Sequence, residues 1–358
     1  MSRSWFFERV VVTAVGICLA LTTISCNKLF KKKSDAGAGS TTSNATAQDL
    51  SDEQMSIKLD AYIKCINTVG HQISRSTDRY FDTLPLPGGP TGKETFAAIF
   101  RVPPGVTANC ASGISRASTL PPDDPKLEIA GTEYASAAQA LDVIINQLAT
   151  YFDTKGFKND KWARGKALHP QFISALKRFN TADRGMHEAV DGITKPLAQR
   201  ALARIEREDG RKFRYGRRKV LITARDLIES ADPVGDDRDV DFNLFNQTYT
   251  DFEKALDELS AYGASHRADL SNPALTTTPL ADSNFTAFTR EATDFKKVSN
   301  LWWQCLRGAP ASSKTASGKI DKAKIGRCAD GSNPIDRKDK TVKEYNDFIN
   351  TSNGQPFP

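Results

Sequence analysis

The chain has 358 residues, of which 39% are hydrophobic and 26% charged, a composition typical of a globular protein with a substantial core. Its 49 Lys and Arg residues and 43 Asp and Glu residues give a net charge of +6. This balance does not predict nucleic-acid binding, although its sign suits anionic lipid or glycan surfaces. With 4 histidines the chain has little material for a histidine-based metal enzyme, and we expect no cofactor.

The N-terminal residues have the pattern of a bacterial lipoprotein signal. Arg3 and Arg9 flank a short basic region, and an apolar run over 10–21 follows. This run is shorter than the roughly 20 residues that a membrane span needs. Residues 23–26, Thr-Ile-Ser-Cys, resemble the end of a lipobox, with Thr23 where Leu is usual. We therefore expect a signal peptide over 1–25 and a lipid on Cys26, the alternative being a plain secretory signal.

Residues 26–48 are expected to form the lipidated N-terminus and a flexible tether. Three lysines at 31–33 precede a run rich in Gly, Ala, Ser and Thr, which cannot bury a core. Asn27 follows Cys26 in place of an aspartate, which favours sorting to the outer membrane. These features predict an envelope protein that is anchored to the membrane by its lipid and faces the periplasm.

Apolar residues at helical spacing predict an all-α fold. Ser51 and Gln54 are typical of a capping box, and an apolar seam then runs from Met55 to Leu84. The following helices are expected around 134–152, 172–197, 212–230, 245–259 and 285–306. Pro196 is expected to kink or split the 172–197 helix. We therefore expect an elongated antiparallel helical bundle with disulfide-pinned loops over 49–309.

Two segments outside these helices are expected to be less regular. The stretch from 85 to about 124 is rich in Pro and Gly, and it contains Cys110. Residues 310–358 are rich in Lys, Ser and Gly. They are expected to form a loop-rich tail with one short helix at 342–349.

The chain contains 6 cysteines. Cys18 lies in the signal peptide and Cys26 carries the expected lipid, which leaves Cys65, Cys110, Cys305 and Cys328 in an oxidising compartment. Of the three possible connectivities we favour the local pairs, because each brackets a loop rich in Pro and Gly. Each bridge would contribute about 3–4 kcal/mol. The absence of a Cys-x-x-Cys motif argues against thiol redox catalysis and zinc binding.

The densest basic cluster in the sequence is a candidate anion-binding face. It consists of Arg211, Lys212, Arg214, Arg217, Arg218 and Lys219. Such a run is most often a solvated helix face. Arginine also binds headgroup, lipopolysaccharide or glycan phosphates through two parallel hydrogen bonds, which makes an anion site the functional alternative.

A histidine on a predicted helix and a pair of tryptophans are two further candidate sites. His187 has Asp191 where a zinc protease would have its second histidine, so we expect a local polar pair and no metal site. Trp302 falls on the apolar seam and is expected in the core, whereas Trp303 is a possible contact for a sugar or a partner.

Several short blocks are spread over most of the mature chain. They are 58–65 (Lys-Leu-Asp-Ala-Tyr-Ile-Lys-Cys), 89–92 (Gly-Pro-Thr-Gly), 109–110 (Asn-Cys), 151–152 (Tyr-Phe), 157–160 (Phe-Lys-Asn-Asp), 165–169 (Gly-Lys-Ala-Leu-His), 210–215 (Gly-Arg-Lys-Phe-Arg-Tyr) and 344–347 (Glu-Tyr-Asn-Asp). Together they resemble the YiiG-like family of bacterial envelope lipoproteins, grouped under a domain of unknown function.

The resemblance implies a Gram-negative envelope lipoprotein with a helical domain, and it supports pairing Cys65 with Cys110. It implies no activity. The Cys305 and Cys328 pair and the adjacent tryptophans depart from the family pattern.

One hypothesis joins two basic blocks into a site. Lys166 and His169 lie in an expected turn, and the cluster from Arg211 to Lys219 follows a later chain reversal. In an antiparallel bundle both blocks would share one end and form an anion-binding surface.

The leading interpretation is a non-enzymatic, membrane-tethered binding or scaffolding module for an anionic envelope polymer or a protein partner. The alternatives are a periplasmic hydrolase using His169 or His187, and a mechanical spacer.

Overall fold

The computed structural model describes residues 47–84, 88–231, 239–267, 278–321, 324–325 and 334–354. Helices dominate these ranges, so the predicted all-α fold is confirmed. The chain divides into two compact units, an N-terminal unit that ends at Gly192 and a C-terminal unit that begins at Ile193. The expected signal peptide, the lipidation site Cys26 and nearly all of the tether lie outside the described residues. No helix in these ranges is both long enough and apolar enough to span a membrane.

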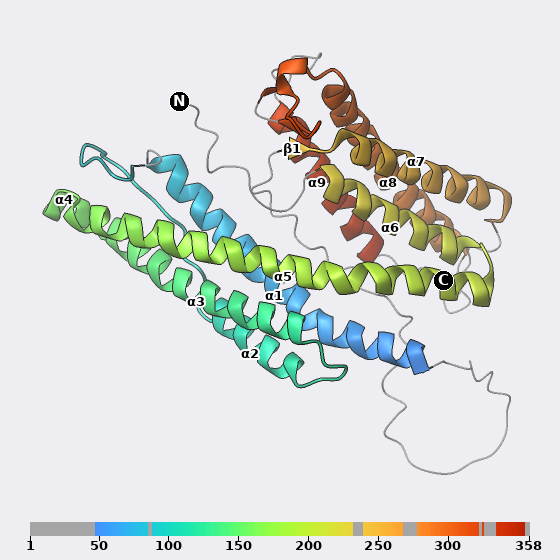
Figure 1. Cartoon of the computed structure of the whole chain (residues 1–358), viewed down its shortest axis with the longest axis horizontal. Coiled ribbons are helices and arrows are strands. Elements are labelled where there is room, and N and C mark those ends of the chain that lie inside the picture. The colour runs from blue at the N-terminus through green and yellow to red at the C-terminus, as the bar shows by residue number, and fades with distance from the viewer. Residues whose placement is uncertain are drawn as a thin grey trace, which may run out of the picture. The chain divides into compact units, whose positions relative to one another are not determined.

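The N-terminal unit contains α1 (Ala47–Thr83), α2 (Val106–Ser118), α3 (Pro125–Asp153), the short α4 (Gly156–Asp160) and the first part of α5 (Ala163–Asp209), as Figure 1 shows. The predicted seam of α1 is confirmed as core, with Leu59, Tyr62, Ile66 and Val69 all buried. The predicted capping box is wrong. Because α1 begins at Ala47, Ser51 lies inside the helix and not at its N-cap.

The segment expected to be irregular contains α2, which the sequence reasoning missed. This helix begins after Gly105, whose φ of +84° is in the left-handed region that favours glycine. It is short and rich in Ala and Ser, so its apolar periodicity is weak beside the Pro- and Gly-rich flanks. The next helix, α3, has a strong local start, because the Asp124 side chain accepts a hydrogen bond from Leu127 N at 2.9 Å.

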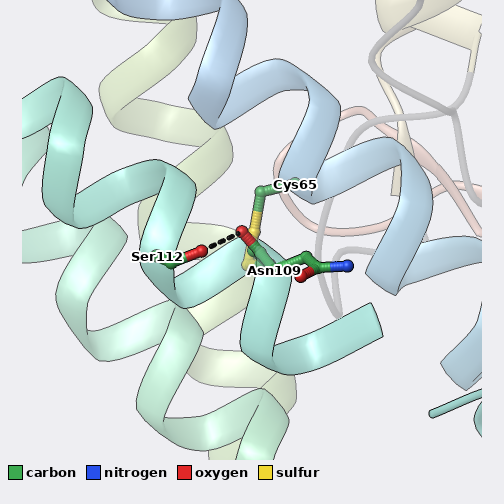
Figure 2. The surroundings of a disulfide bond; sticks show 4 residues. Cys65, Asn109 and Ser112 are labelled. Atoms are coloured by element: carbon green, nitrogen blue, oxygen red, sulfur yellow. Dashed lines mark hydrogen bonds between the residues drawn. A yellow bond between two sulfur atoms is a disulfide. The ribbon is translucent and has the colours of Figure 1, made fainter. Parts of the chain in front are cut away.

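A disulfide joins α2 to α1 (Figure 2). It links Cys65 with Cys110, both buried, across 45 residues, which is the expected local pairing. Ser112 stands one turn along α2 and donates to the carbonyl of Asn109 at 3.1 Å. Cys305 is also disulfide-bonded, and its expected partner Cys328 lies outside the described residues.

The C-terminal unit contains the end of α5 and the helices α6 (Phe213–Ala231), α7 (Phe242–Ser265), α8 (Thr278–Arg307) and α9 (Pro334–Gly354). Each of α6 to α9 packs against the next, and α9 also contacts α6, which closes a four-helix bundle. Large aromatic side chains fill its core: Phe245, Phe252, Phe288, Phe295, Trp302 and Phe348. A one-turn 3-10 helix spans Ala311–Ser313, and β1 (Asp239–Val240) pairs antiparallel with β2 (Ile320–Asp321).

The structure corrects three expectations about organisation. The expected loop-rich tail contains the 21-residue α9, whose Phe348 packs against Phe288 with ring centroids 5.0 Å apart, so α9 belongs to the bundle. The expected single bundle over 49–309 is divided between the two units. Pro196 does not split α5, because one missing hydrogen bond is outweighed by the burial of Leu197 and Ala198 beside it.

Candidate functional site

The turn around α4 at one end of the N-terminal unit is built on a cluster of aromatic side chains. Phe157 and Trp162 stack with ring centroids 4.7 Å apart, and Tyr151 packs edge-on against Trp162. Lys155, Lys161 and Trp162 all have positive φ, a conformation that is uncommon for residues other than glycine. Buried aromatic packing therefore holds the backbone in a strained turn, an arrangement that is enriched at binding sites.

Asp160 stabilises this turn through hydrogen bonds that fill its carboxylate. It accepts from Tyr151 Oη at 2.7 Å, from Trp162 N at 2.9 Å and from Arg164 N at 3.0 Å. The hydrogen bond from Tyr151, followed by those from the backbone, lowers the pKa of Asp160. This carboxylate is therefore fully occupied in holding the turn.

A loop over 88–95 lies against the same turn. Glu94 accepts hydrogen bonds from Thr91 N at 2.8 Å, from Thr91 Oγ1 at 2.6 Å and from Gly92 N at 2.9 Å. Burial raises the pKa of Glu94, but these hydrogen bonds outweigh that effect and lower the pKa to about 2. The indole of Trp162 donates to the Glu94 carbonyl at 3.1 Å and so ties the loop to the turn. A Cβ on Gly92 would lie 3.1 Å from Lys166 Nζ, which places that ammonium at the loop.

Exposed cations gather where the loop meets the turn, and we name this set the basic tip. It consists of Lys93, Lys155, Lys158, Lys161, Arg164 and Lys166, all exposed. The neighbouring carboxylates are engaged, since Glu94 and Asp160 bind the backbone and Asp153 pairs with Arg101 at 2.8 Å. Glu94 and Asp160 keep their negative charge, but the six cations of the tip outnumber them, and this excess of positive charge is suited to a large anion.

His169 does not belong to this exposed surface, contrary to its prediction as an anion-binding residue. It is only 7% exposed, and its Nδ1 lies 2.7 Å from Tyr80 Oη. A Cβ on Gly89 would come within 2.4 Å of the His169 ring, so the loop backbone covers the imidazole. The imidazole is part of the core beneath the tip, while Lys166 three residues earlier is exposed as predicted.

His187 is also buried, and its nearest charged partner is Asp183, one helical turn earlier, with 3.7 Å between the imidazole Nε2 and the carboxylate. The predicted partner was Asp191, one turn later. Among the described residues no group of three or more His, Cys, Asp or Glu side chains forms a metal site.

The predicted arginine cluster after α5 is mostly committed to partners within the chain. Arg211 pairs with Glu206 at 2.7 Å, Arg214 with Asp209, and Lys219 with Glu258 at 2.8 Å. Arg217 lies over the Phe288 ring and donates to the carbonyl and hydroxyl oxygens of Ser352 at 3.0 and 2.9 Å. Lys212 is exposed. The cluster is therefore largely a set of bonds that hold α6 to its neighbours.

Each of the two predicted basic blocks belongs to a different unit. Lys166 and His169 lie in the first turns of α5, whereas the cluster begins after the last residue of the same helix, Asp209. Within either unit only one block is present, so the expected joint surface does not form inside either unit.

Trp302 is buried as predicted, whereas Trp303 is half-buried. The indole of Trp303 donates to Asn246 Oδ1 at 2.8 Å, and Arg307 lies 5.1 Å from its ring centroid. These contacts hold the Trp303 side chain within the bundle.

Comparison with known proteins gives a family model that matches residues 53–354 and is described as "Protein of unknown function (DUF3829)". The uncharacterized protein YiiG of Escherichia coli (strain K12) is 31% identical over 218 residues. That alignment covers 60% of this chain and 58% of YiiG, so it spans under two thirds of the relative. No solved structure gives a significant match.

Proposed function

The chain belongs to the family described as a protein of unknown function (DUF3829), and we propose that it is a membrane-tethered binding module of the bacterial envelope. In this proposal the lipid on Cys26 anchors the chain, and the basic tip of the N-terminal unit holds an anionic, phosphate-bearing envelope polymer. The proposal involves no catalysis and no nucleic acid.

The observation that carries the proposal is that the six exposed cations of the tip outnumber the two carboxylates beside them, Glu94 and Asp160. Lys93, Lys161 and Lys166 are exposed where the loop meets the turn. The nearest acids, Glu94 and Asp160, direct their oxygens to backbone N–H groups. A polymer with repeated phosphates meets several ammonium groups at once, and such contacts strengthen binding at low ionic strength.

The hydrolase alternative has less support at His169. A general base must reach the proton that it abstracts. Here Nδ1 faces the Tyr80 hydroxyl, and the ring edge is covered by Gly89. The mechanical-spacer alternative predicts that deleting turns of helix would alter function, whereas Arg211→Glu and Arg214→Glu would leave it intact.

The test measures binding of the full chain, in a neutral detergent, to fluorescein-labelled polyphosphate by anisotropy. The tip variant Lys93→Glu/Lys161→Glu/Lys166→Glu should weaken binding at least tenfold, and salt should weaken binding of the wild type. The matched control, Lys64→Glu/Arg116→Glu/Lys126→Glu, changes the charge of the same unit by the same amount at other exposed positions. An equal loss in both variants would mean that net charge alone acts, and it would contradict a site at the tip.

A further inference from the structure

The arginines on α6 include two guanidinium groups with buried nitrogens that have no hydrogen-bond partner among the described residues. No residue of α6 between Phe213 and Ala231 is fully exposed, so the helix is at least partly covered along its whole length. Arg218 Nε and Nη2 are inaccessible to solvent and donate no hydrogen bond to the described residues. Arg225 Nε and Nη1 are likewise inaccessible to solvent and donate no hydrogen bond to the described residues. Four guanidinium nitrogens are thus enclosed without an acceptor.

The two arginines share one face of the helix. They are seven residues apart, which is two helical turns, and their charges interact. Burial, together with the positive charges of Arg225 and of Arg204 on α5, lowers the pKa of Arg218 to about 10. Like charges are therefore held near each other in a partly dry environment.

The carboxylates near this face compensate only part of the charge. Glu229 lies 3.4 Å from Arg225 Nε, but it also pairs with Lys195 at 2.6 Å. Asp226 lies 3.5 Å from Arg225 Nη2, at the limit of a hydrogen bond. In the described part of the chain no carboxylate forms an ion pair with Arg218. An enclosed donor without an acceptor is costly, and an enclosed charge without a counter-ion is more so.

We infer that Arg218 and Arg225 form a binding site for a single phosphate group. A tetrahedral oxyanion supplies the acceptors that the enclosed nitrogens lack, and guanidinium groups match its geometry through paired hydrogen bonds. Because Arg218 is half-buried as a residue, we expect phosphate to enter when its side chain moves toward solvent. The phosphate comes either free in solution or as the headgroup of a phosphomonoester. This site lies in the C-terminal unit and is independent of the basic tip.

The test is a thermal denaturation of the full chain in phosphate-free buffer, titrated with inorganic phosphate and, separately, with glycerol 3-phosphate. Phosphate at a hundredfold excess over its Kd should raise Tm by about 5 °C or more, with saturation. Sodium chloride at the same ionic strength should not. A rise with glycerol 3-phosphate at lower concentration would identify a phosphomonoester as the ligand, and a rise with inorganic phosphate alone would identify the free ion.

Variants distinguish this site from a general effect of salt. Arg218→Gln and Arg225→Gln should abolish the rise, and Arg218→Lys, which retains the charge but not the paired donors, should weaken it. Arg211→Gln is the matched control, because Arg211 is exposed and already paired with Glu206, and it should respond like the wild type. Without phosphate, Arg218→Gln should have a higher Tm than the wild type, since it removes an uncompensated charge. No rise with either anion, or an equal rise in Arg218→Gln, would overturn the inference.

Discussion

The basic tip and the arginine cluster use positive charge in opposite ways. At the tip, a loop brings Lys93 to the five cations of residues 155–166, and all six side chains are exposed to solvent. In the cluster, by contrast, Arg217 binds Ser352 on α9 and Lys219 binds Glu258 on α7. Density of charge along a sequence is therefore a poor guide to exposure of charge on a surface. The following predictions test that contrast.

The largest effect on stability is expected from removal of the α1–α2 disulfide, and it should be confined to the N-terminal unit. Replacing both cysteines of the α1–α2 disulfide, Cys65→Ala/Cys110→Ala, opens a loop of 45 residues and should destabilise the N-terminal unit by about 4 kcal/mol. Urea denaturation followed by hydrogen exchange of each unit provides the measurement. The phosphate response of the C-terminal unit should be unchanged. A coupled loss of both units would contradict the independence of the two basic regions.

Removing a buried cation whose donors are all paired should lower stability, whereas removing one with unpaired donors should not. Lys58 is fully buried, and its Nζ donates to the carbonyls of Leu120 and Pro122 at 3.0 Å each and to Glu128 at 2.5 Å. Lys58→Met should therefore cost about 3 kcal/mol, because it leaves these acceptors unpaired. Lys64→Met, on the exposed face of the same helix, should change stability by less than about 0.5 kcal/mol. Arg218→Gln, by contrast, is expected to raise stability. A neutral effect of Lys58→Met would contradict this difference between paired and unpaired buried cations.

The loop of the basic tip should open in acid. The folded-state pKa of Glu94, about 2, lies below its ordinary value of 4.5, so its stabilisation is present above pH 4.5 and is lost as pH falls toward 2. Fluorescence of Trp162, whose indole binds the Glu94 carbonyl, reports the opening. In Glu94→Gln the transition in this pH range should disappear. A transition of the same amplitude in that variant would assign the change to another group.

The smallest effect is expected from an exposed ion pair. Arg211 is paired with Glu206, but its side chain is 72% exposed, and such pairs contribute little in water. Arg211→Gln should leave thermal stability and polyphosphate binding within experimental error of the wild type. A clear loss of polyphosphate binding would contradict this prediction and would indicate that the anion binds at the arginine cluster.

The sequence predicted the helical class and much of the core because apolar spacing is a local signal. The α1 seam and Trp302 were identified correctly for this reason. Helix α9 was underestimated because its sequence is mostly polar, and only the spacing of Val342, Tyr345 and Phe348 indicates its buried face. The missed α2 has the same explanation, since Ala, Ser and Gly supply little periodic signal.

The candidate sites were less accessible to prediction because they depend on which charges meet in space. Lys166 was identified from its turn, but its neighbours Lys93 and Lys161 come from the loop and from a turn with positive φ. Nothing local marks Arg218 as enclosed or Arg211 as exposed, since both lie in one basic run. The helical spacing of Arg218, Arg225 and Glu229 places them on a single face of α6, but spacing alone does not say whether that face is buried.

The most direct test of the contrast is a comparison of polyphosphate binding by two triple variants of the full chain. One variant neutralises the tip with Lys93→Gln/Lys161→Gln/Lys166→Gln, and the other neutralises the cluster with Arg211→Gln/Lys212→Gln/Lys219→Gln. We expect the first to lose at least tenfold in affinity at low salt and the second to bind like the wild type. An equal loss in both, or a loss in the cluster variant alone, would contradict the claim that exposure at the tip, and not charge density in the sequence, determines where the anion binds.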